Sequence, residues 1–250
     1  MTGAIHLERH GEHVALLTID NPPMNALGQA MREAFIAALD EIEADPAVRA
    51  ILISGTGRAF CAGDDLKQGK AAEGGPAGFA ALLERLDQTR SPIIGAINGW
   101  CVGGGFELAL ACDIRIASTQ ARFTCAGVNM GLMASAYRLP RLIGVSRAKA
   151  MLLTGTPFDA ETAERFGLVT ALHAADDLRD AAIRLAERIA SRAPLSVEAT
   201  KTVAGRAVDM SPEEADAMQA DILRDLRASA DHAEAVAAFR EKRDPVFTRR

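Results

Sequence analysis

Three consecutive glycines are followed closely by a carboxylate near the middle of the chain. Gly103, Gly104 and Gly105 come after an apolar segment and open a stretch that favours a helix, and Glu107 follows them. Glycines at a helix start leave backbone amides uncovered, so a ligand oxygen can approach them with help from the positive helix end. Glu107 comes three residues after Gly104 and so projects from the same helix face. A carboxylate beside such amides suits proton transfer next to a carbonyl group.

The glycine run alone has simpler explanations. It could make a tight turn, with Glu107 exposed in the first helical turn. A dinucleotide site fits poorly, because the third glycine of a G-x-G-x-x-G motif is missing and the run follows the third expected strand, not the first. The interpretation of the glycines and Glu107 as a catalytic site therefore needs support from a second motif.

That second motif also follows a buried strand. It reads Arg58-Ala59-Phe60-Cys61-Ala62-Gly63-Asp64-Asp65-Leu66-Lys67 and places two carboxylates directly after a glycine. The side chain of Asp64 could act as an acid or base. Alternatively, it faces solvent or caps the following turn, and Asp65 is expected to be structural.

Alternating apolar segments predict the elements that carry both motifs. Strands are expected over 14–19, 50–54, 92–97 and 113–117, and helices over 28–44, 77–88 and 108–111. Strand–helix alternation predicts a mainly parallel sheet with helical crossovers. Beyond residue 145 the chain is mostly helical, over 146–154, 159–166, 175–192, 195–208, 212–227 and 231–241, with one short strand at 168–170.

Composition narrows the class of protein. The chain has 250 residues, 49% of them hydrophobic, and a formal net charge of -5. We therefore expect a globular protein that binds neither nucleic acid nor a membrane. The N-terminus lacks the pattern of a signal peptide. Four cysteines without a Cys-x-x-Cys spacing indicate reduced thiols, no zinc site and a cytoplasmic location. They are Cys61, Cys101, Cys112 and Cys125.

Together the two motifs resemble the crotonase (enoyl-CoA hydratase/isomerase) superfamily, and the likeness runs over most of the chain. Further matching segments are Pro23-Met24-Asn25-Ala26-Leu27, Leu153-Thr154-Gly155 and Ala163-Glu164-Arg165-Phe166-Gly167-Leu168-Val169. The resemblance implies an α/β spiral of strand-strand-helix turns over 1–190. It also implies a C-terminal helical region over 191–250 that builds homotrimers, often paired into hexamers.

The resemblance also implies a function and a site. It suggests an enzyme of the enoyl-CoA hydratase type, with coenzyme A as part of the substrate and with no cofactor or metal. Asp64 N–H and Gly104 N–H would form an oxyanion hole, and Glu107 would be the first of two hydratase glutamates. The implied acyl-CoA-binding residues are Met24, Ala26, Leu27, Ala62, Gly63, Asp64, Asp65, Leu66, Lys67, Trp100, Val102, Gly103, Gly104 and Gly127.

The chain departs from the hydratase pattern at the second glutamate. Counting forward from Glu107 places Gly127 there, which weakens the expectation of efficient hydration. Isomerase, decarboxylase or thioesterase chemistry, or non-catalytic acyl-CoA binding, therefore remain alternatives. A glycine is expected to leave room for a larger side chain. Hydratases often have a small residue where this chain has Asp64. Dehalogenation is not supported, because the aspartate nucleophile of related dehalogenases falls at Ser135.

A few residues near the motifs have two interpretations each. Ser135 and Tyr137 could donate a proton or could lie at the core or rim. Trp100 could pack on the acyl or pantetheine arm or belong to the core. The five histidines lie outside both motifs and are expected at the surface, at His6, His10, His13, His173 and His232.

Overall fold

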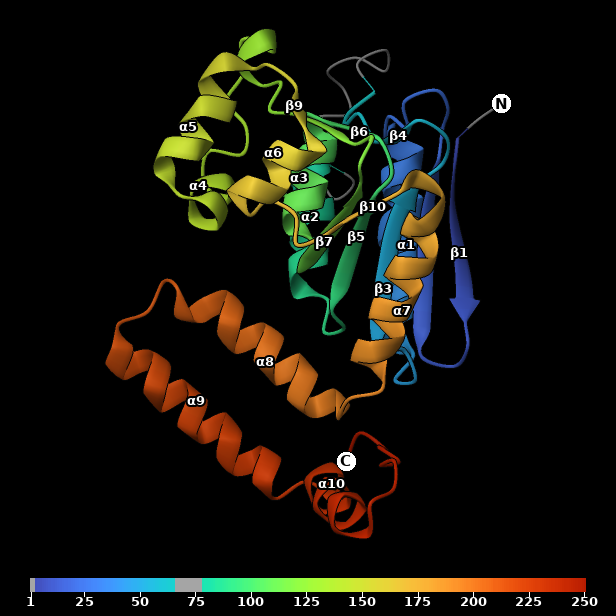
Figure 1. Ribbon diagram of the computed structural model, residues 1–250, viewed down its shortest axis with the longest axis vertical. Helices are drawn as coiled ribbons and strands as arrows, with labels where there is room; N and C mark the ends of the chain where they lie inside the picture. The colour runs from blue at the N-terminus through green and yellow to red at the C-terminus, as the bar shows by residue number, and fades with distance from the viewer. Residues whose placement is uncertain (1–2, 66–77) are drawn as a thin grey trace.

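The computed structural model describes residues 3–65 and 78–250, which form two sheets surrounded by helices (Figure 1). The larger sheet has the strand order β1-β2-β3-β5-β7-β10. Its strands β1 and β2 are antiparallel, and all its other neighbouring strands are parallel. The strands are β1 Ala4–His10, β2 Val14–Asp20, β3 Ala50–Gly55, β5 Ile93–Ile97, β7 Ile114–Ser118 and β10 Leu172–His173.

A smaller sheet follows the larger one turn by turn. Its order is β4-β6-β8-β9, with β4, β6 and β8 parallel and β9 antiparallel to β8. Each long strand is followed by a short one, as in β3–β4, β5–β6 and β7–β8. This order confirms the spiral of strand-strand-helix turns. The short strands are β4 Ala59–Cys61, β6 Trp100–Val102, β8 Arg122–Thr124 and β9 Phe158–Asp159.

Helices cover both faces of the larger sheet. The main core packs α1 (Gln29–Ala44), α2 (Phe79–Gln88) and α3 (Gly104–Ala111) against one face, through side chains such as Phe35, Leu86 and Phe106. A second apolar cluster packs α7 (Leu178–Ala190) against the other face. Packing against the sheet thus fixes the position of α3, and α3 carries Glu107.

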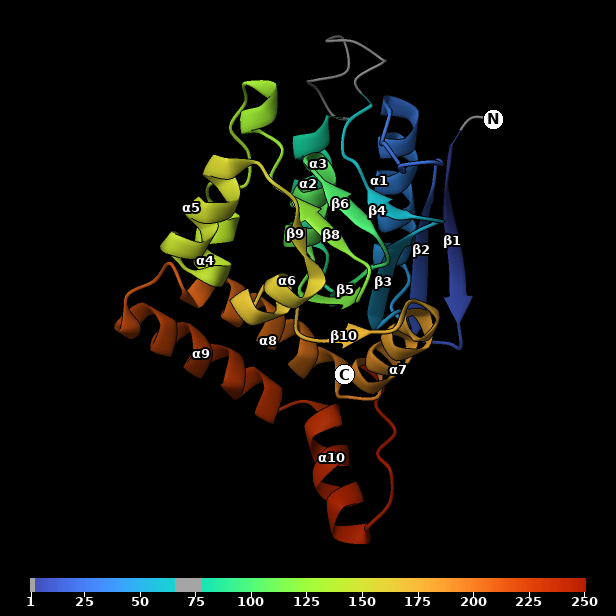
Figure 2. The same cartoon turned by 45° about the horizontal axis from the view of Figure 1, so that its top comes forward.

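The C-terminal part of the chain is helical, as expected. Helix α8 runs past one end of the larger sheet, and α9 and α10 lie farther from the sheets (Figures 1 and 2). Helix α9 buries no residue in this chain. Within residues 3–65 and 78–250, no helix has the length and apolarity needed to cross a membrane. The helices after α3 are α4 Arg138–Ile143, α5 Val145–Thr154, α6 Ala160–Phe166, α7, α8 Pro194–Ala207, α9 Pro212–Arg227 and α10 Ala230–Glu241.

One strand was misplaced by the sequence pattern. Residues 168–170 form bends, and the strand lies at Leu172–His173. Leu168 and Val169 are apolar because they are buried in the main core, not because they pair with a strand. The strands of the smaller sheet and β10 have two or three residues, too few for an alternating pattern to be recognised.

Candidate active site

The two motifs meet where the backbone at Gly63 lies against the start of α3. A Cβ on Gly63 would lie 2.5 Å from Gly104 N, and Gly63 has φ +84°. A Cβ on Gly105 would lie 2.0 Å from Cys61 O. Both positions therefore require glycine, since any side chain would push the two segments apart. The close approach explains why both motifs contain glycines.

Helix α3 presents backbone N–H groups at this junction. Its first intrahelical bonds run from Phe106 N and Glu107 N to Gly103 O, at 3.0 and 3.1 Å. The N–H groups of Gly104 and Gly105 precede those bonds and point out of the N-terminal end of the helix. The helix dipole gives this end a partial positive charge. A ligand oxygen that becomes negative would be favoured here.

The motif around Asp64 is held from the other side by the chain near Leu27. Leu27 N donates to Gly63 O at 2.7 Å, and Ala62 N donates to Met24 O at 2.9 Å. Leu27 and Asp64 form a parallel bridge. In such a bridge the backbone alternates, so Asp64 N–H is directed away from Leu27. Met24 and Leu27 thus lie beside the motif and Ala26 lies between them in the chain, whereas Leu66 and Lys67 lie outside the described residues.

Glu107 lies half-buried in the first turn of α3 and accepts hydrogen bonds from Ser135. The Oε1 atom of Glu107 accepts one bond from Ser135 N and another from Ser135 Oγ, the latter at 2.9 Å. Both residues line a pocket of about 450 Å³, together with Met133, Ala134, Ala136, Tyr137 and Arg138. The carboxylate is therefore fixed at one oxygen and borders a cavity. The sequence pointed to Ser135 but not to this contact.

The Asp64 side chain forms an ion pair with Arg32, which the sequence analysis missed. Arg32 Nη1 contacts Asp64 Oδ1 and also donates to Leu27 O at 2.8 Å. The Arg32 side chain is 1% exposed and that of Asp64 is 42% exposed. The sequence contains a sign of this pair: Arg32 comes three residues before Phe35 and so lies on the apolar face of α1, where a charged side chain needs a partner. The ion pair favours a structural role for the Asp64 carboxylate.

Gly127 has less room than expected. It precedes the short 3-10 helix Val128–Met130. A Cβ on Gly127 would lie 3.0 Å from both Ala134 N and Leu132 O. The expectation that the glycine leaves room for a larger side chain was wrong, because the backbone of the following loop folds back over it. That loop leads directly to Ser135.

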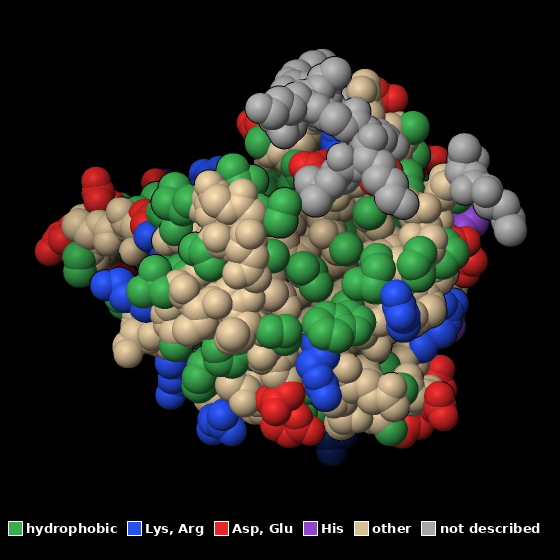
Figure 3. Space-filling view, turned by 90° about the horizontal axis from the view of Figure 1, so that it is seen from above, with side chains coloured by type: hydrophobic (Ala, Val, Ile, Leu, Met, Phe, Trp, Pro, Cys, Tyr) green, Lys and Arg blue, Asp and Glu red, His purple; other side chains and the backbone are tan. Residues whose placement is uncertain are grey.

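Trp100 and Tyr137 lie at the surface. Trp100 is 37% exposed and Tyr137 is 66% exposed, so neither is a core residue. Tyr137 Oη donates to Asp209 Oδ2 at 3.2 Å. Val102 on the same strand as Trp100 is half-buried. The view of the molecule from above shows hydrophobic side chains spread over that side, with few charged ones near its centre (Figure 3).

The cysteines near the site are neutral thiols. Burial raises the pKa of Cys61 to about 12. Burial, with a smaller contribution from the charge of Glu107, raises the pKa of Cys125 to about 12. Neutral buried thiols are poor nucleophiles and poor metal ligands. Across the described residues, no group of three or more histidine, cysteine, aspartate or glutamate side chains is arranged to hold a metal ion.

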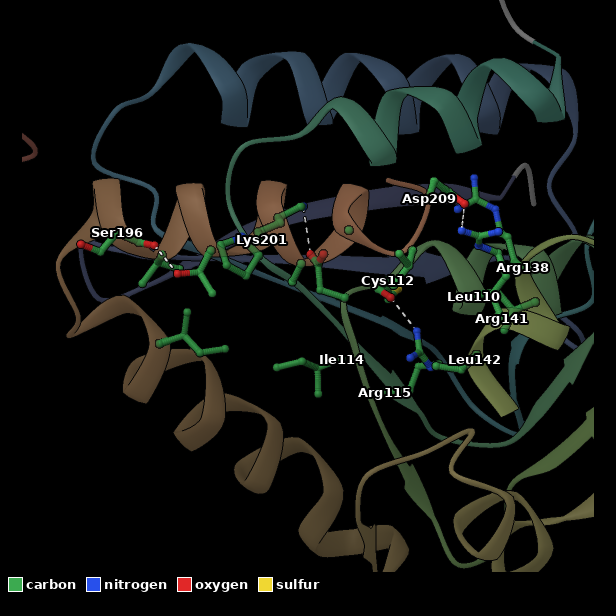
Figure 4. Close-up of a pocket in the computed structure, with 18 of the residues that line it drawn as sticks. Leu110, Cys112, Ile114, Arg115, Arg138, Arg141, Leu142, Ser196, Lys201 and Asp209 are labelled. Carbon is green, nitrogen blue, oxygen red and sulfur yellow. Dashed lines mark hydrogen bonds and ion pairs between the residues drawn. The ribbon is translucent and has the colours of Figure 1, made fainter. Parts of the chain in front are cut away.

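A larger pocket of about 740 Å³ lies between α8 and the end of the larger sheet (Figure 4). Two of its cationic side chains pair with carboxylates that also line it: Lys201 with Asp113 at 2.9 Å, and Arg141 with Asp209. Within each pair the two charges neutralise each other. The Glu107 pocket is the better candidate despite its smaller volume, because the carboxylate of Glu107 and the hydroxyl group of Ser135 meet in it, and Glu107 comes from the first turn of α3.

Comparison with known proteins identifies the family of the chain. The family model described as Enoyl-CoA hydratase/isomerase matches residues 9–250. The chain belongs to this family. Among solved structures, an enoyl-CoA hydratase from Bacillus anthracis has a TM-score of 0.93 and 32% identity, covering 98% of this chain and 99% of that chain.

Curated relatives of this crotonase match along the whole chain. A protein of Mycobacterium tuberculosis named "Probable enoyl-CoA hydratase" is 35% identical over 257 residues, covering 100% of each chain. A carnitinyl-CoA dehydratase of Salmonella agona is 36% identical over 264 residues, covering 99% of each. The family is enzymatic, and the crotonase superfamily assigned from the two motifs is confirmed.

Proposed function

We propose that this crotonase binds an acyl-CoA thioester, stabilises its enolate and uses Glu107 to move a proton at the α-carbon. The observation that carries the proposal is the position of Glu107 in the first turn of α3, whose N-terminus packs against Gly63. A thioester oxygen bound at that junction has its α-carbon beside the carboxylate. Coenzyme A enters as part of the substrate.

In this proposal Asp64 N–H and Gly104 N–H form the oxyanion hole. Removing the α-proton sends its electron pair to the thioester oxygen, which becomes an oxyanion. Preorganised N–H donors stabilise such an oxyanion, each by roughly 2.7–4 kcal/mol in the transition state. Asp64 then acts through its backbone, while its carboxylate holds Arg32. The helix dipole of α3 adds to the stabilisation.

The reaction we favour is the hydration of an enoyl-CoA or the reverse dehydration of a hydroxyacyl-CoA. The similarity to a carnitinyl-CoA dehydratase and to hydratases supports this class. With Gly127 in place of the second carboxylate, Glu107 carries the proton transfers alone, so hydration is expected to be slow. Isomerisation, decarboxylation and thioester hydrolysis remain alternatives within the enzymes.

Gly127 supports a second candidate, a protein that binds acyl-CoA without turning it over. The Glu107 carboxylate argues against it, because a half-buried carboxylate beside helix N–H groups has no evident binding role. A carboxylate at that position repels the negative charge of an enolate unless it takes up the proton itself. Proton exchange at the α-carbon therefore separates this candidate from an enzyme.

We further propose that the chain acts as a homotrimer or a pair of trimers in the cytoplasm. Residues 1–190 would form the spiral core and residues 191–250 the region of subunit contact. Support comes from the exposed apolar side chains of the C-terminal helices. These are Leu223 on α9 and Phe239 on α10, and Val208 and Val246 follow the ends of α8 and α10.

A panel of acyl-CoA thioesters followed by mass spectrometry tests the proposed function. The panel should contain enoyl-, 3-hydroxyacyl-, malonyl-type and saturated acyl-CoA esters. Hydration adds the mass of water, decarboxylation removes carbon dioxide and hydrolysis releases free coenzyme A. We expect gain or loss of water with one enoyl or hydroxyacyl ester. Binding without any mass change in H2O or D2O would support the non-catalytic candidate.

A further inference from the structure

Both hydrogen bonds that the Glu107 carboxylate accepts within the described residues come from Ser135, and both end on the same oxygen. Ser135 N–H and Ser135 Oγ–H converge on Oε1. Oε2, the other oxygen, accepts neither bond. The two carboxylate oxygens are therefore unequal before any substrate arrives.

The backbone of Ser135 is shaped for this convergence. Its φ is +59°, a left-handed conformation that non-glycine residues rarely adopt. The residue is 6% exposed, and its carbonyl oxygen accepts a bond from Leu139 N at 3.2 Å, at the start of α4. A strained and buried conformation persists only where its surroundings fix it, and such residues cluster at functional sites. Here that conformation directs the amide and the hydroxyl to one atom.

We infer that Ser135 is a positioning residue that anchors Glu107 Oε1 and so reserves Oε2 for proton exchange with the substrate. This inference rests on the proposed function. Glu107 Oε2 takes the α-proton, the carboxylate becomes a carboxylic acid, and the C–H electron pair moves to the thioester oxygen. Return of a proton from the same oxygen reverses the step. Because Gly127 has no side chain that could bind the carboxylate, the orientation of Glu107 depends on Ser135.

Exchange of α-protons tests this role without requiring the physiological substrate. Butyryl-CoA in D2O cannot be hydrated, so gain of deuterium reports α-proton transfer alone. The variants Ser135→Gly and Ser135→Ala both remove the hydroxyl, but only glycine relieves the positive φ. We expect the maximal exchange rate to fall about tenfold or more in both, as for a lost hydrogen bond to a charged group. The Kd for butyryl-CoA should stay within about twofold of the wild-type value.

A double-mutant cycle separates positioning from a merely structural role. In a Glu107→Gln background, Ser135→Gly should cause little further loss of exchange, because Ser135 acts through Glu107. Two results would overturn the inference. One is a Ser135→Gly variant that exchanges α-protons at the wild-type rate. The other is a Ser135→Gly change that lowers the exchange rate by the same factor in the Glu107→Gln background as in wild type.

The same data distinguish failure of this inference from failure of the proposed function. If Glu107→Gln loses exchange while both Ser135 variants keep it, only the role of Ser135 is wrong. If wild type shows no exchange, or Glu107→Gln exchanges at the wild-type rate, the proposed function fails and this inference fails with it.

Discussion

The carboxylate of Asp64 pairs with the guanidinium of Arg32, which is almost completely buried in the first helix. The pair links the segment after β4 to α1, while Arg32 also donates to Leu27 O. One side chain thus contacts both Leu27 and Asp64, the two residues of the parallel bridge beside Gly63. The side chain of Asp64 therefore has a structural role beside the site. The proposed role of Asp64 in the reaction belongs to its backbone N–H.

Replacing Asp64 should lower stability more than activity. Removing one partner of a buried ion pair costs about 3–5 kcal/mol, and solvent screening of the half-exposed Asp64 reduces this to about 1–2 kcal/mol. Urea unfolding of Asp64→Ala measures the loss, and Asp64→Asn should recover part of it by accepting a bond from Arg32. The rate should fall less than tenfold, because both variants keep the backbone N–H. A hundredfold fall in rate at unchanged stability would make the carboxylate a catalytic group.

Adding a side chain at Gly127 should strain the loop that carries Ser135. The Cβ of Gly127→Ala meets Ala134 N and Leu132 O at 3.0 Å, and overpacking of this kind costs about 1–3 kcal/mol. Gly127→Glu restores a carboxylate but incurs the same strain, so we expect little or no gain in the slow hydration of crotonyl-CoA. The rates at which wild type, Gly127→Ala and Gly127→Glu hydrate crotonyl-CoA test this prediction. A large gain for Gly127→Glu alone would show that the loop adapts and that only the carboxylate was lacking.

The buried thiols should make the fold sensitive to alkaline pH. Burial raises the pKa of Cys61 and Cys112 from 9.0 to about 12. Above pH 9 the unfolded chain therefore loses thiol protons that the folded chain keeps, so stability is undiminished below that pH and declines as pH rises toward 12. Urea midpoints at pH 8 and pH 10 measure this decline. At pH 8 the folded chain should resist iodoacetamide, whereas all four cysteines should react in denaturant; rapid labelling of the folded chain would contradict this burial.

The apolar side chains of the C-terminal helices should be covered in solution. Phe239 is 86% exposed in the single chain, and a large exposed apolar surface marks a contact site. Light scattering at micromolar concentration should give the mass of a trimer or hexamer. Phe239→Asp should weaken the assembly, whereas Glu213→Gln on α9 serves as a polar control. A monomer at micromolar concentration would contradict the proposed assembly.

Much of the fold was predictable because its main strands and helices are long and strongly patterned. The strand at Val14–Asp20 and the helix at Gln29–Ala44 lie close to their expected positions. Short strands such as Ala59–Cys61 were missed, since they form only by pairing with distant segments. The same limit applies to the site. Glu107 and the glycines follow from local spacing, but the contact of Glu107 with Ser135 joins residues 28 positions apart through a loop that no periodic pattern describes.

The central claim is that Glu107 moves a proton at the α-carbon of a bound acyl-CoA. Exchange of α-protons in D2O by Glu107→Gln, with binding followed by calorimetry, tests it most directly. The exposed variant Glu84→Gln serves as the control. We predict that Glu107→Gln binds butyryl-CoA as tightly as wild type but exchanges about a hundredfold more slowly, as expected for a lost acid/base. Exchange by Glu107→Gln at the rate of Glu84→Gln would contradict the account.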